Sequence, residues 1–165
     1  MTEPETLTFK DDGTIPNSRL PLLLYRSALS ADPAVMERTF AAHDWSNSWR
    51  DGIFRYHHFH SIAHEVLGIA AGSVTVMFGG SNGRAVEVNA GDVVVIPAGV
   101  GHCNQGQSSD LLVVGAYPGG MGYDICRGDP ADHVRVRSNI AHVPRPRQDP
   151  VSGTQGPLVR FWRGA

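Results

Sequence analysis

The stretch Gly52–Gly72, GIFRYHHFHSIAHEVLGIAAG, decides the fold and the chemistry that this sequence predicts. It contains four of the eight histidines of the chain, and a glutamate follows the last of them. His58 and His60 are two positions apart, so in a β-strand their side chains would project from one face, about 7 Å apart. Glu65 follows a four-residue connection, which is long enough to start a neighbouring strand. Two imidazoles and a carboxylate that converge in this way are typical ligands of a metal ion.

A second stretch, Gly91–Gly106, reads GDVVVIPAGVGHCNQG and adds a third imidazole. Its His102 would come from a different strand than His58 and His60. Three imidazoles and one carboxylate suit a first-row transition metal and leave coordination positions open for water or substrate. Such a site polarises a bound oxygen atom, lowers the pKa of a bound water or activates dioxygen, and the sequence does not choose among these.

Together the two stretches resemble the two motifs of the cupin family, over roughly residues 50–118. The first motif is written G, five residues, HxH, three or four residues, E, six residues, G. Its positions are met by Gly52, His58, His60, Glu65 and Gly72. The second motif is written G, five residues, PxG, two residues, H, three residues, N. Its positions are met by Gly91, Pro97, Gly99 and His102, whereas Gly106 stands where the family has asparagine.

The resemblance implies an all-β fold, a double-stranded β-helix or jelly-roll barrel. It also implies that His58, His60, Glu65 and His102 hold one divalent transition metal ion, which would be manganese, iron, nickel or zinc. The apolar pattern independently favours a sandwich or barrel, because short strands follow one another with glycine turns between them. The expected strands are two around the histidines (Ile53 to Phe59 and Val66–Ile69), then Ser73–Phe78, Ala85–Val88, Val93–Ile96 and Leu111–Tyr117.

The flanking segments are expected to pack on this barrel, so that residues 1–49, 50–118 and 119–165 form one domain overall. Before the barrel, Pro21–Tyr25 is an apolar run that its proline limits to a strand edge or an extended arm. Ala31–His43 predicts a helix, with Asp32 as its N-cap and Pro33 in its first turn. After the barrel, HVRVR at residues 133–137 favours a strand, and residues 144–157 an extended tail. Phe161 and Trp162 are too apolar for solvent and are expected to dock on the barrel.

Several residues near the motifs have more than one interpretation. His64 directly precedes Glu65, and because the family also allows a three-residue spacing, His64 would be the ligand in that register. Otherwise His64 is a candidate catalytic acid or base, since its ordinary pKa suits proton transfer near neutrality. Tyr56 shares strand parity with His58 and is the second candidate catalytic residue. Weaker pocket candidates, for which packing or surface pairing is the alternative, are Asn104, Tyr117, Asp124 and Arg127.

Composition excludes several classes of partner. The formal net charge of −2 gives no broad basic surface for nucleic acid or an anionic membrane. The apolar runs are shorter than the roughly twenty residues that span a bilayer, and the first residues lack the pattern of a secretory signal. Two cysteines do not make a disulfide framework. We therefore expect a cytoplasmic protein that takes a small-molecule substrate and, as isolated cupin domains commonly do, pairs as a homodimer.

These features predict a metal-dependent enzyme of the dioxygenase, decarboxylase or isomerase type that acts on a small organic acid or sugar-like molecule. The first alternative is a non-catalytic cupin module that captures a small ligand or a metal ion. A metal-free structural β-domain is the second alternative, but a fold kept only for packing has no need of three converging imidazoles.

Overall fold

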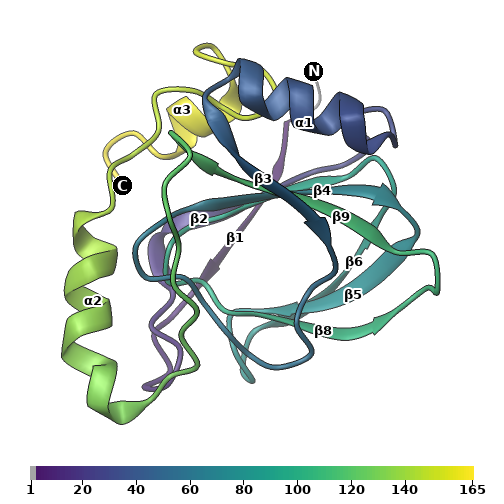
Figure 1. The fold of residues 1–165 in the computed structure, drawn as a ribbon. Helices are drawn as coiled ribbons and strands as arrows, with labels where there is room; N and C mark the ends of the chain where they lie inside the picture. The colour runs from purple at the N-terminus through teal and green to yellow at the C-terminus, as the bar shows by residue number, and fades with distance from the viewer. Residues whose placement is uncertain (1–2) are drawn as a thin grey trace.

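The computed structural model describes residues 3–165 and folds them into two antiparallel β-sheets with helices outside them (Figure 1). Met1 and Thr2, the first two residues of the segment 1–49, lie outside the described residues. The strands are β1 (Glu5–Phe9), β2 (Ser18–Tyr25), β3 (Trp45–Asp51), β4 (Glu65–Ala71), β5 (Ser73–Phe78), β6 (Arg84–Asn89), β7 (Val93–Ile96), β8 (His102–Gln107) and β9 (Leu112–Pro118). The helices are α1 (Pro33–Ala42), a 3-10 turn (Pro130–Asp132), α2 (His133–His142) and α3 (Pro157–Phe161).

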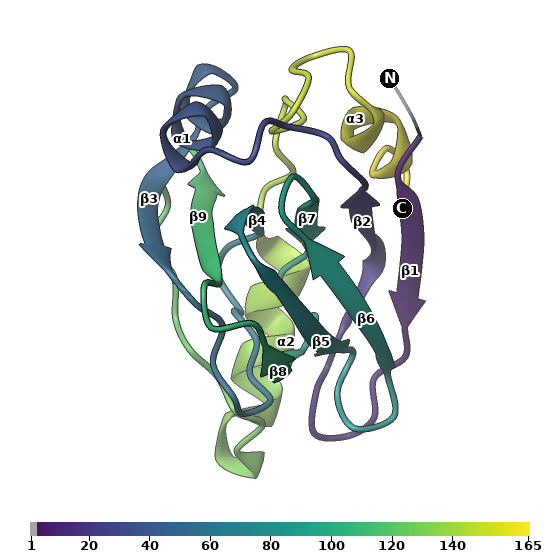
Figure 2. The same cartoon turned by 90° about the vertical axis from the view of Figure 1, so that its right-hand side faces the viewer.

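The larger sheet has the strand order β1-β2-β7-β4-β9-β3, and the smaller sheet has the order β6-β5-β8. Strands close in sequence are split between the two sheets, which face one another in Figure 2. This arrangement confirms the predicted all-β jelly roll. None of the helices formed by residues 3–165 is long and apolar enough to cross a bilayer.

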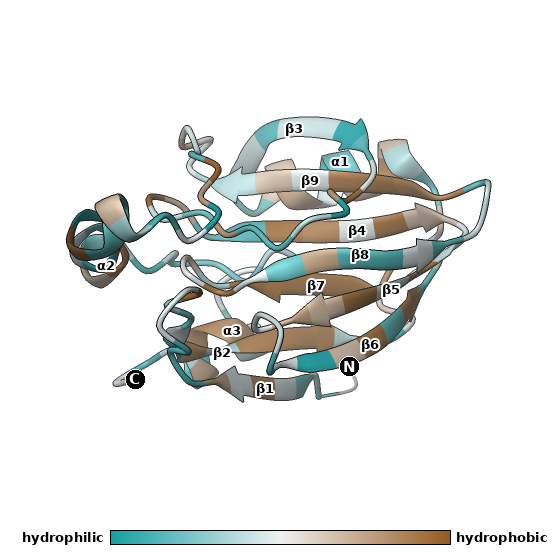
Figure 3. Ribbon diagram, turned by 90° about the horizontal axis from the view of Figure 1, so that it is seen from below, coloured by the Kyte–Doolittle hydropathy of each residue, from teal (hydrophilic) through white to brown (hydrophobic). Residues whose placement is uncertain are grey.

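The four inner strands of the larger sheet, β2, β7, β4 and β9, are buried on both faces, which explains their continuous apolar runs (Figure 3), whereas the edge strands β1 and β3 are largely exposed. Along β4, Leu67 and Ile69 point between the two sheets, whereas Val66 and Ala70 point to the outer face. This alternation follows from the two-residue period of a strand. It also settles the direction of the neighbouring polar residues, because Glu65 shares the parity of Leu67.

Helix α1 covers the outer face of the larger sheet, against β3, β4 and β9. Asp32 caps it as predicted, since its Oδ1 accepts hydrogen bonds from the backbone nitrogens of Ala34 and Val35 at 2.8 and 3.3 Å. Met36 and Phe40, one helical turn apart, are fully buried against the sheet. The helix predicted over residues 31–43 is therefore confirmed.

The expectation that Pro21 confines its segment to a strand edge or an arm is wrong. Strand β2 lies inside the larger sheet, between β1 and β7. The pairing of β2 with β7 begins only at Leu23, and the pairing with β1 shifts register between Leu7 and Phe9. Pro21 thus falls where the ladders are interrupted, so its missing N–H leaves no ladder bond unmade.

The segment after β9 differs from its predicted course. HVRVR is the start of helix α2 rather than a strand, and Val136 and Ile140, four residues apart, pack together in one small cluster with Phe59. The segment 144–157 is not extended but turns around Asp149, whose carboxylate accepts hydrogen bonds from the Tyr25 hydroxyl and the Leu158 nitrogen.

The chain after this turn closes the outer face of the larger sheet beside α1 (Figure 1). Trp162 is 1% exposed, and its indole nitrogen donates to the carbonyl of Pro21 at 2.9 Å. Phe161 is partly buried against the same apolar cluster. Both aromatic residues therefore dock as predicted.

Candidate metal centre

A backbone bridge between two segments brings the histidines together. His58 and His102 exchange two backbone hydrogen bonds, of 3.2 and 2.9 Å, so that their rings lie with centroids 4.0 Å apart. The predicted strand over Ile53 to Phe59 is not formed, because this segment pairs only through isolated bridges at His58 and Phe59. His58 and His60 still face the same cavity, as their two-residue spacing predicts.

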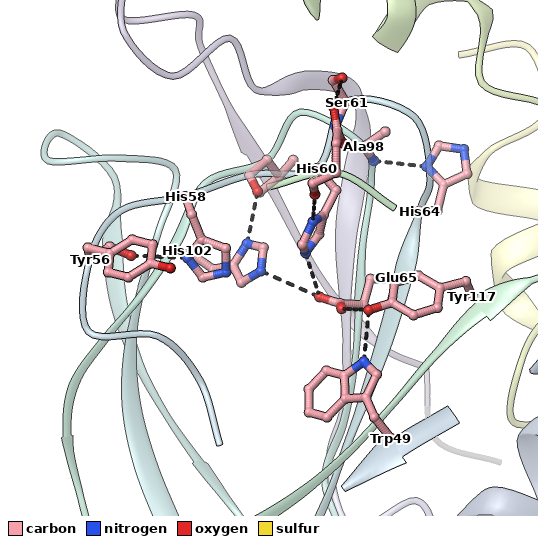
Figure 4. Close-up of polar contacts among 12 residues, drawn as sticks. Trp49, Tyr56, His58, His60, Ser61, His64, Glu65, Ala98, His102 and Tyr117 are labelled. Atoms are coloured by element: carbon pink, nitrogen blue, oxygen red, sulfur yellow. Dashed lines mark hydrogen bonds and ion pairs between the residues drawn. The ribbon is translucent and has the colours of Figure 1, made fainter. Parts of the chain in front are cut away.

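The three imidazoles are held with one nitrogen free. The Nδ1 atom of each ring lies within hydrogen-bond distance of a backbone carbonyl oxygen, which can only accept. These pairs are His58 with Tyr56 (3.0 Å), His60 with Asp124 (2.5 Å) and His102 with Val100 (3.1 Å). Each Nδ1 therefore carries the proton and each Nε2 presents its lone pair, as in metal-ligating histidines. One ring nitrogen from each histidine lies within 4.8 Å of the others (Figure 4).

Glu65 completes the cluster from the first position of β4. Its Oε1 atom lies 3.3 Å from Nε2 of His60 and 3.4 Å from Nε2 of His102. Its Oε2 atom accepts a hydrogen bond from the Tyr117 hydroxyl at 2.8 Å, and that hydroxyl accepts one from the indole N–H of Trp49, also at 2.8 Å (Figure 4). A buried carboxylate is thus oriented by a two-step chain of donors.

Electrostatics favour a neutral His58 and an ionised Glu65, the forms that ligate a metal ion, whereas Glu65 favours the protonated form of His60 as long as no metal ion is bound. Burial, and then the neighbouring His102, lower the pKa of His58 to about 3, so this imidazole stays neutral. Burial raises the pKa of Glu65, but the adjacent His60 and His102 outweigh it and hold that pKa well below its usual range. Burial likewise lowers the pKa of His60, yet Glu65 reverses the net direction and raises it. Burial and Glu65 raise the pKa of Tyr117, so its hydroxyl remains a donor.

These groups fit a divalent transition metal. Neutral imidazole nitrogens and an ionised carboxylate are the donor set that manganese, iron, nickel and zinc share, and the chemistry of the set does not select one of them. Three buried histidines, His58, His60 and His102, can bind such an ion, and the carboxylate of Glu65 lies beside two of them. The Nδ1 bonds to carbonyls are the outer contacts that orient ligating histidines in metal sites.

The cluster forms one wall of a cavity of about 580 Å³, which is within the usual size range of small-molecule sites. Aromatic and aliphatic side chains form most of the remaining wall. They include Trp49, Phe54, Leu67, Leu111, Tyr117 and Tyr123. The cavity therefore has room for a substrate as well as an ion.

Neither of the two predicted catalytic residues lines this cavity. His64 has the opposite strand parity to Glu65, so its ring points to the outer face, where it lies 4.8 Å from the ring of Trp162. Its Nδ1 accepts a hydrogen bond from the backbone nitrogen of Ala98 at 2.9 Å, and burial lowers its pKa to about 4. In this structure Glu65, and not His64, faces the histidine cluster.

Tyr56 lies beside the cluster rather than within the cavity. Its ring is stacked on Phe54, with centroids 4.9 Å apart, and the guanidinium of Arg127 sits 4.0 Å above its centre. Tyr56 contacts the cluster through its backbone carbonyl oxygen, which accepts a hydrogen bond from Nδ1 of His58. Of the weaker candidates, Asn104 is not among the residues that line the cavity, but its amide donates to the carbonyl of Ile53 and to the amide oxygen of Gln107, which do.

Two contributors to the site, Trp49 and Tyr123, were not identified from the sequence, and Asp124 was identified only as a weaker pocket candidate. Trp49 lines the cavity and donates a hydrogen bond to the hydroxyl of Tyr117. Tyr123 stacks on Tyr117 with ring centroids 4.6 Å apart. Asp124 supplies the carbonyl for His60, and its own carboxylate accepts hydrogen bonds from the backbone nitrogen and hydroxyl of Ser61. The aromatic character of residues 117 and 123 was the available signal, but nothing in the sequence places that loop over the histidines.

Comparison with known proteins places the chain in a family. The family model described as cupin matches residues 50–118. The uncharacterized protein YjlB of Bacillus subtilis (strain 168) is 44% identical over 161 residues, which cover 97% of each chain. Among solved structures, the WlaRB TDP-quinovose 3,4-ketoisomerase of Campylobacter jejuni is 16% identical with a TM-score of 0.45, covering 55% of this chain and 75% of its own. The acireductone dioxygenase of Bacillus anthracis, which has a cadmium ion in its active centre, is 16% identical with a TM-score of 0.44, covering 58% and 77%. The protein described here belongs to the cupin superfamily.

Proposed function

We propose that this protein is a metal-dependent enzyme that acts on a small organic acid or sugar-like molecule. The observation that carries the proposal is the convergence of three Nδ1-protonated imidazoles and one ionised carboxylate on the wall of a cavity. When bound there, a divalent metal ion supplies a Lewis acid for an oxygen atom of the substrate. The residues that would hold it are His58, His60, Glu65 and His102.

The chain's own residues prepare this site before any ion or substrate arrives. The carbonyls of Tyr56, Asp124 and Val100 fix the three ring orientations. Tyr117 holds one oxygen of Glu65 and leaves the other toward the imidazoles. Because these bonds are made by backbone groups and buried side chains, little reorganisation is needed on binding, which is typical of preorganised active sites.

The proposal is tested by activity with matched variants. Protein reconstituted separately with Mn²⁺, Fe²⁺, Ni²⁺ or Zn²⁺ is incubated with panels of small organic acids and sugars, and oxygen uptake, carbon dioxide release and isomerisation are followed. We expect turnover with at least one metal and one substrate class. His102→Ala should abolish it, whereas His133→Ala, which removes an exposed histidine of α2, should not.

The alternative function has its own signature in the same experiment. A non-catalytic binding module would bind a small molecule in the cavity with every metal and convert it with none. Saturable binding without turnover across all panels would therefore contradict the enzyme proposal. The homodimer and the cytoplasmic location stay predictions, and light scattering of the purified protein tests the first of them.

A further inference from the structure

Flat aromatic side chains surround the histidine cluster on its open side. Phe54 lies next to His58, with ring centroids 5.1 Å apart and the rings nearly perpendicular. Tyr123 lies next to His60 in the same manner, at 5.4 Å. Phe54 is 45% exposed and Tyr123 is 42% exposed, although both are large apolar rings beside a cavity. Aromatic faces that stay accessible at the entrance of a cavity are available to stack on a bound molecule.

The third aromatic side chain of the cavity wall, Trp49, is held in place by its cross-strand pairing with a glycine. Trp49 of β3 stands opposite Gly115 of β9, and a Cβ atom at residue 115 would lie 2.2 Å from the indole ring. The absence of a side chain thus lets the indole lie flat on the neighbouring strand. Its N–H is fixed to the Tyr117 hydroxyl, and Tyr117 in turn stacks on Tyr123. This wall is therefore rigid before a ligand binds.

Besides the histidines and Glu65, the charged side chains that line the cavity within residues 3–165 are Arg50 and Asp51, and Oδ1 of Asp51 accepts a hydrogen bond from the backbone nitrogen of Gly52 at 2.8 Å. Apart from the histidines, Arg50 is the only basic residue among the described residues that line the cavity, and its guanidinium is bound twice to Glu37 of α1, at 2.6 and 3.2 Å. Arginine binds a phosphate group through two N–H groups of its guanidinium. Those groups of Arg50 are already bonded to Glu37. The amide oxygen of Gln107, another polar group of the wall, accepts a hydrogen bond from Asn104 at 2.8 Å.

We infer that the cavity takes a molecule with an oxygen-bearing head, which reaches the histidine cluster, and a flat, uncharged apolar body of about one ring, which stacks among Phe54, Trp49 and Tyr123. This inference rests on the proposed function, because the head is assigned to the metal centre. It narrows the substrate from organic acids and sugars in general to organic acids or enols with an aromatic or similarly flat body. The chemistry of the wall, rather than that of the metal ligands, sets this preference.

The test compares probes that share one metal-chelating head and differ only in the body. Acetohydroxamate, benzohydroxamate, gluconohydroxamate and phosphoglycolohydroxamate carry a methyl, a phenyl, a polyhydroxylated and a phosphorylated body on the same hydroxamate. Their binding to the Zn²⁺-loaded full chain is measured by calorimetry, because zinc undergoes no redox change. We expect benzohydroxamate to bind about tenfold or more tightly than the other three, as burial of a ring on aromatic walls predicts.

Variants at the cavity entrance show whether the rings cause the preference. Tyr123→Ser should lower the affinity for benzohydroxamate about fivefold or more and leave the affinity for acetohydroxamate within about twofold of the wild type. Tyr123→Phe, which keeps the ring, should change neither affinity. Light scattering of the same samples shows whether a change of subunit contacts accounts for the loss.

Each outcome bears on the inference. The aromatic assignment is overturned if benzohydroxamate binds no more tightly than any one of the other probes. It is also overturned if benzohydroxamate keeps its higher affinity both in Tyr123→Ser and in Phe54→Ser, the corresponding variant at the other exposed ring. In both cases the metal centre stands. Zinc retention with no hydroxamate bound also overturns the aromatic assignment. Failure to retain any metal ion in the wild-type chain defeats the proposed function itself, and the inference with it.

Discussion

The hydroxyl of Tyr117 donates to Oε2 of Glu65 at 2.8 Å, while the other oxygen of the same carboxylate lies 3.3 Å from Nε2 of His60. One oxygen of Glu65 is thus occupied by a protein donor, and the other is directed at the imidazoles. Tyr117 itself is fully buried and is fixed by the indole N–H of Trp49. The orientation of the Glu65 carboxylate is therefore determined by a residue of β9, a strand that carries none of the proposed metal ligands.

Tyr117→Phe should weaken metal binding without removing any ligand. The variant keeps the ring but leaves Oε2 of Glu65 buried without its donor, and loss of such an outer contact typically weakens metal affinity about tenfold to a hundredfold. Competition with a fluorescent chelator measures the affinity. Tyr123→Phe, which removes a hydroxyl from the neighbouring ring, is the matched control and should bind as the wild type does. Equal affinities in all three proteins would show that Tyr117 does not position Glu65.

Gly115→Ala should destabilise the protein and displace Trp49. The new methyl group would lie 2.2 Å from the indole ring, so the ring or the strand has to shift, and overpacking of this kind costs about 1–3 kcal/mol. Urea unfolding measures the loss, and tryptophan emission reports the displaced ring. At Gly122, an added Cβ has nothing within 4 Å, so Gly122→Ala is the control. A stability within error of the control would contradict the close contact.

The thiol of Cys126 should be unreactive near neutral pH. Burial, together with the Asp124 carboxylate 3.2 Å away, raises the pKa of Cys126 to about 11. Because the thiolate is the reacting form, only about one molecule in a thousand is reactive at pH 8, against about one in four for an ordinary cysteine. In a Cys103→Ala background, alkylation by iodoacetamide should therefore rise about tenfold per pH unit up to pH 10.

Asp124→Asn provides the control for that prediction. It removes the negative charge beside the sulfur while keeping the size of the side chain, so the pKa of Cys126 should fall and alkylation at pH 8 should become faster. An alkylation rate that levels off near pH 8.5 in the protein with native Asp124 would show that the thiol is not shielded as described.

The fold and the acidic and imidazole groups of the site could be predicted because their signals are local. The ligand candidates occur within two short stretches, but the sequence left open whether Glu65 or His64 faces the cavity, and the structure is needed to show that it is Glu65. Strand β7 is an unbroken apolar run, as expected of a buried strand, and β5 alternates between buried and half-buried residues, as expected of a strand with one face in the core. Helix α1 carries its cap and proline at the expected positions.

The predictions from the sequence that were wrong or incomplete depend on contacts between residues far apart in the chain. The alternating Val and Arg of residues 133–137 also satisfies a helix, because Val136 and Ile140 share a helical face, and only the neighbouring Phe59 selects that face. Strand β3 is polar on its exposed side and shifts register between Ser46 and Trp49, which hides its period. The loop that carries Tyr123 reaches His60 by tertiary packing across more than sixty residues of chain, which no spacing rule encodes.

The central claim is that His58, His60, Glu65 and His102 hold one metal ion. Elemental analysis of protein purified without an affinity tag, run beside His58→Ala and the exposed-histidine control His133→Ala, tests it most directly. We predict about one divalent transition metal ion per chain in the wild type and in His133→Ala, and less than about a tenth of that in His58→Ala, with the circular dichroism of the β-fold unchanged in all three. Full metal content in both His58→Ala and His102→Ala, or no metal in the wild type even after reconstitution, would contradict the claim.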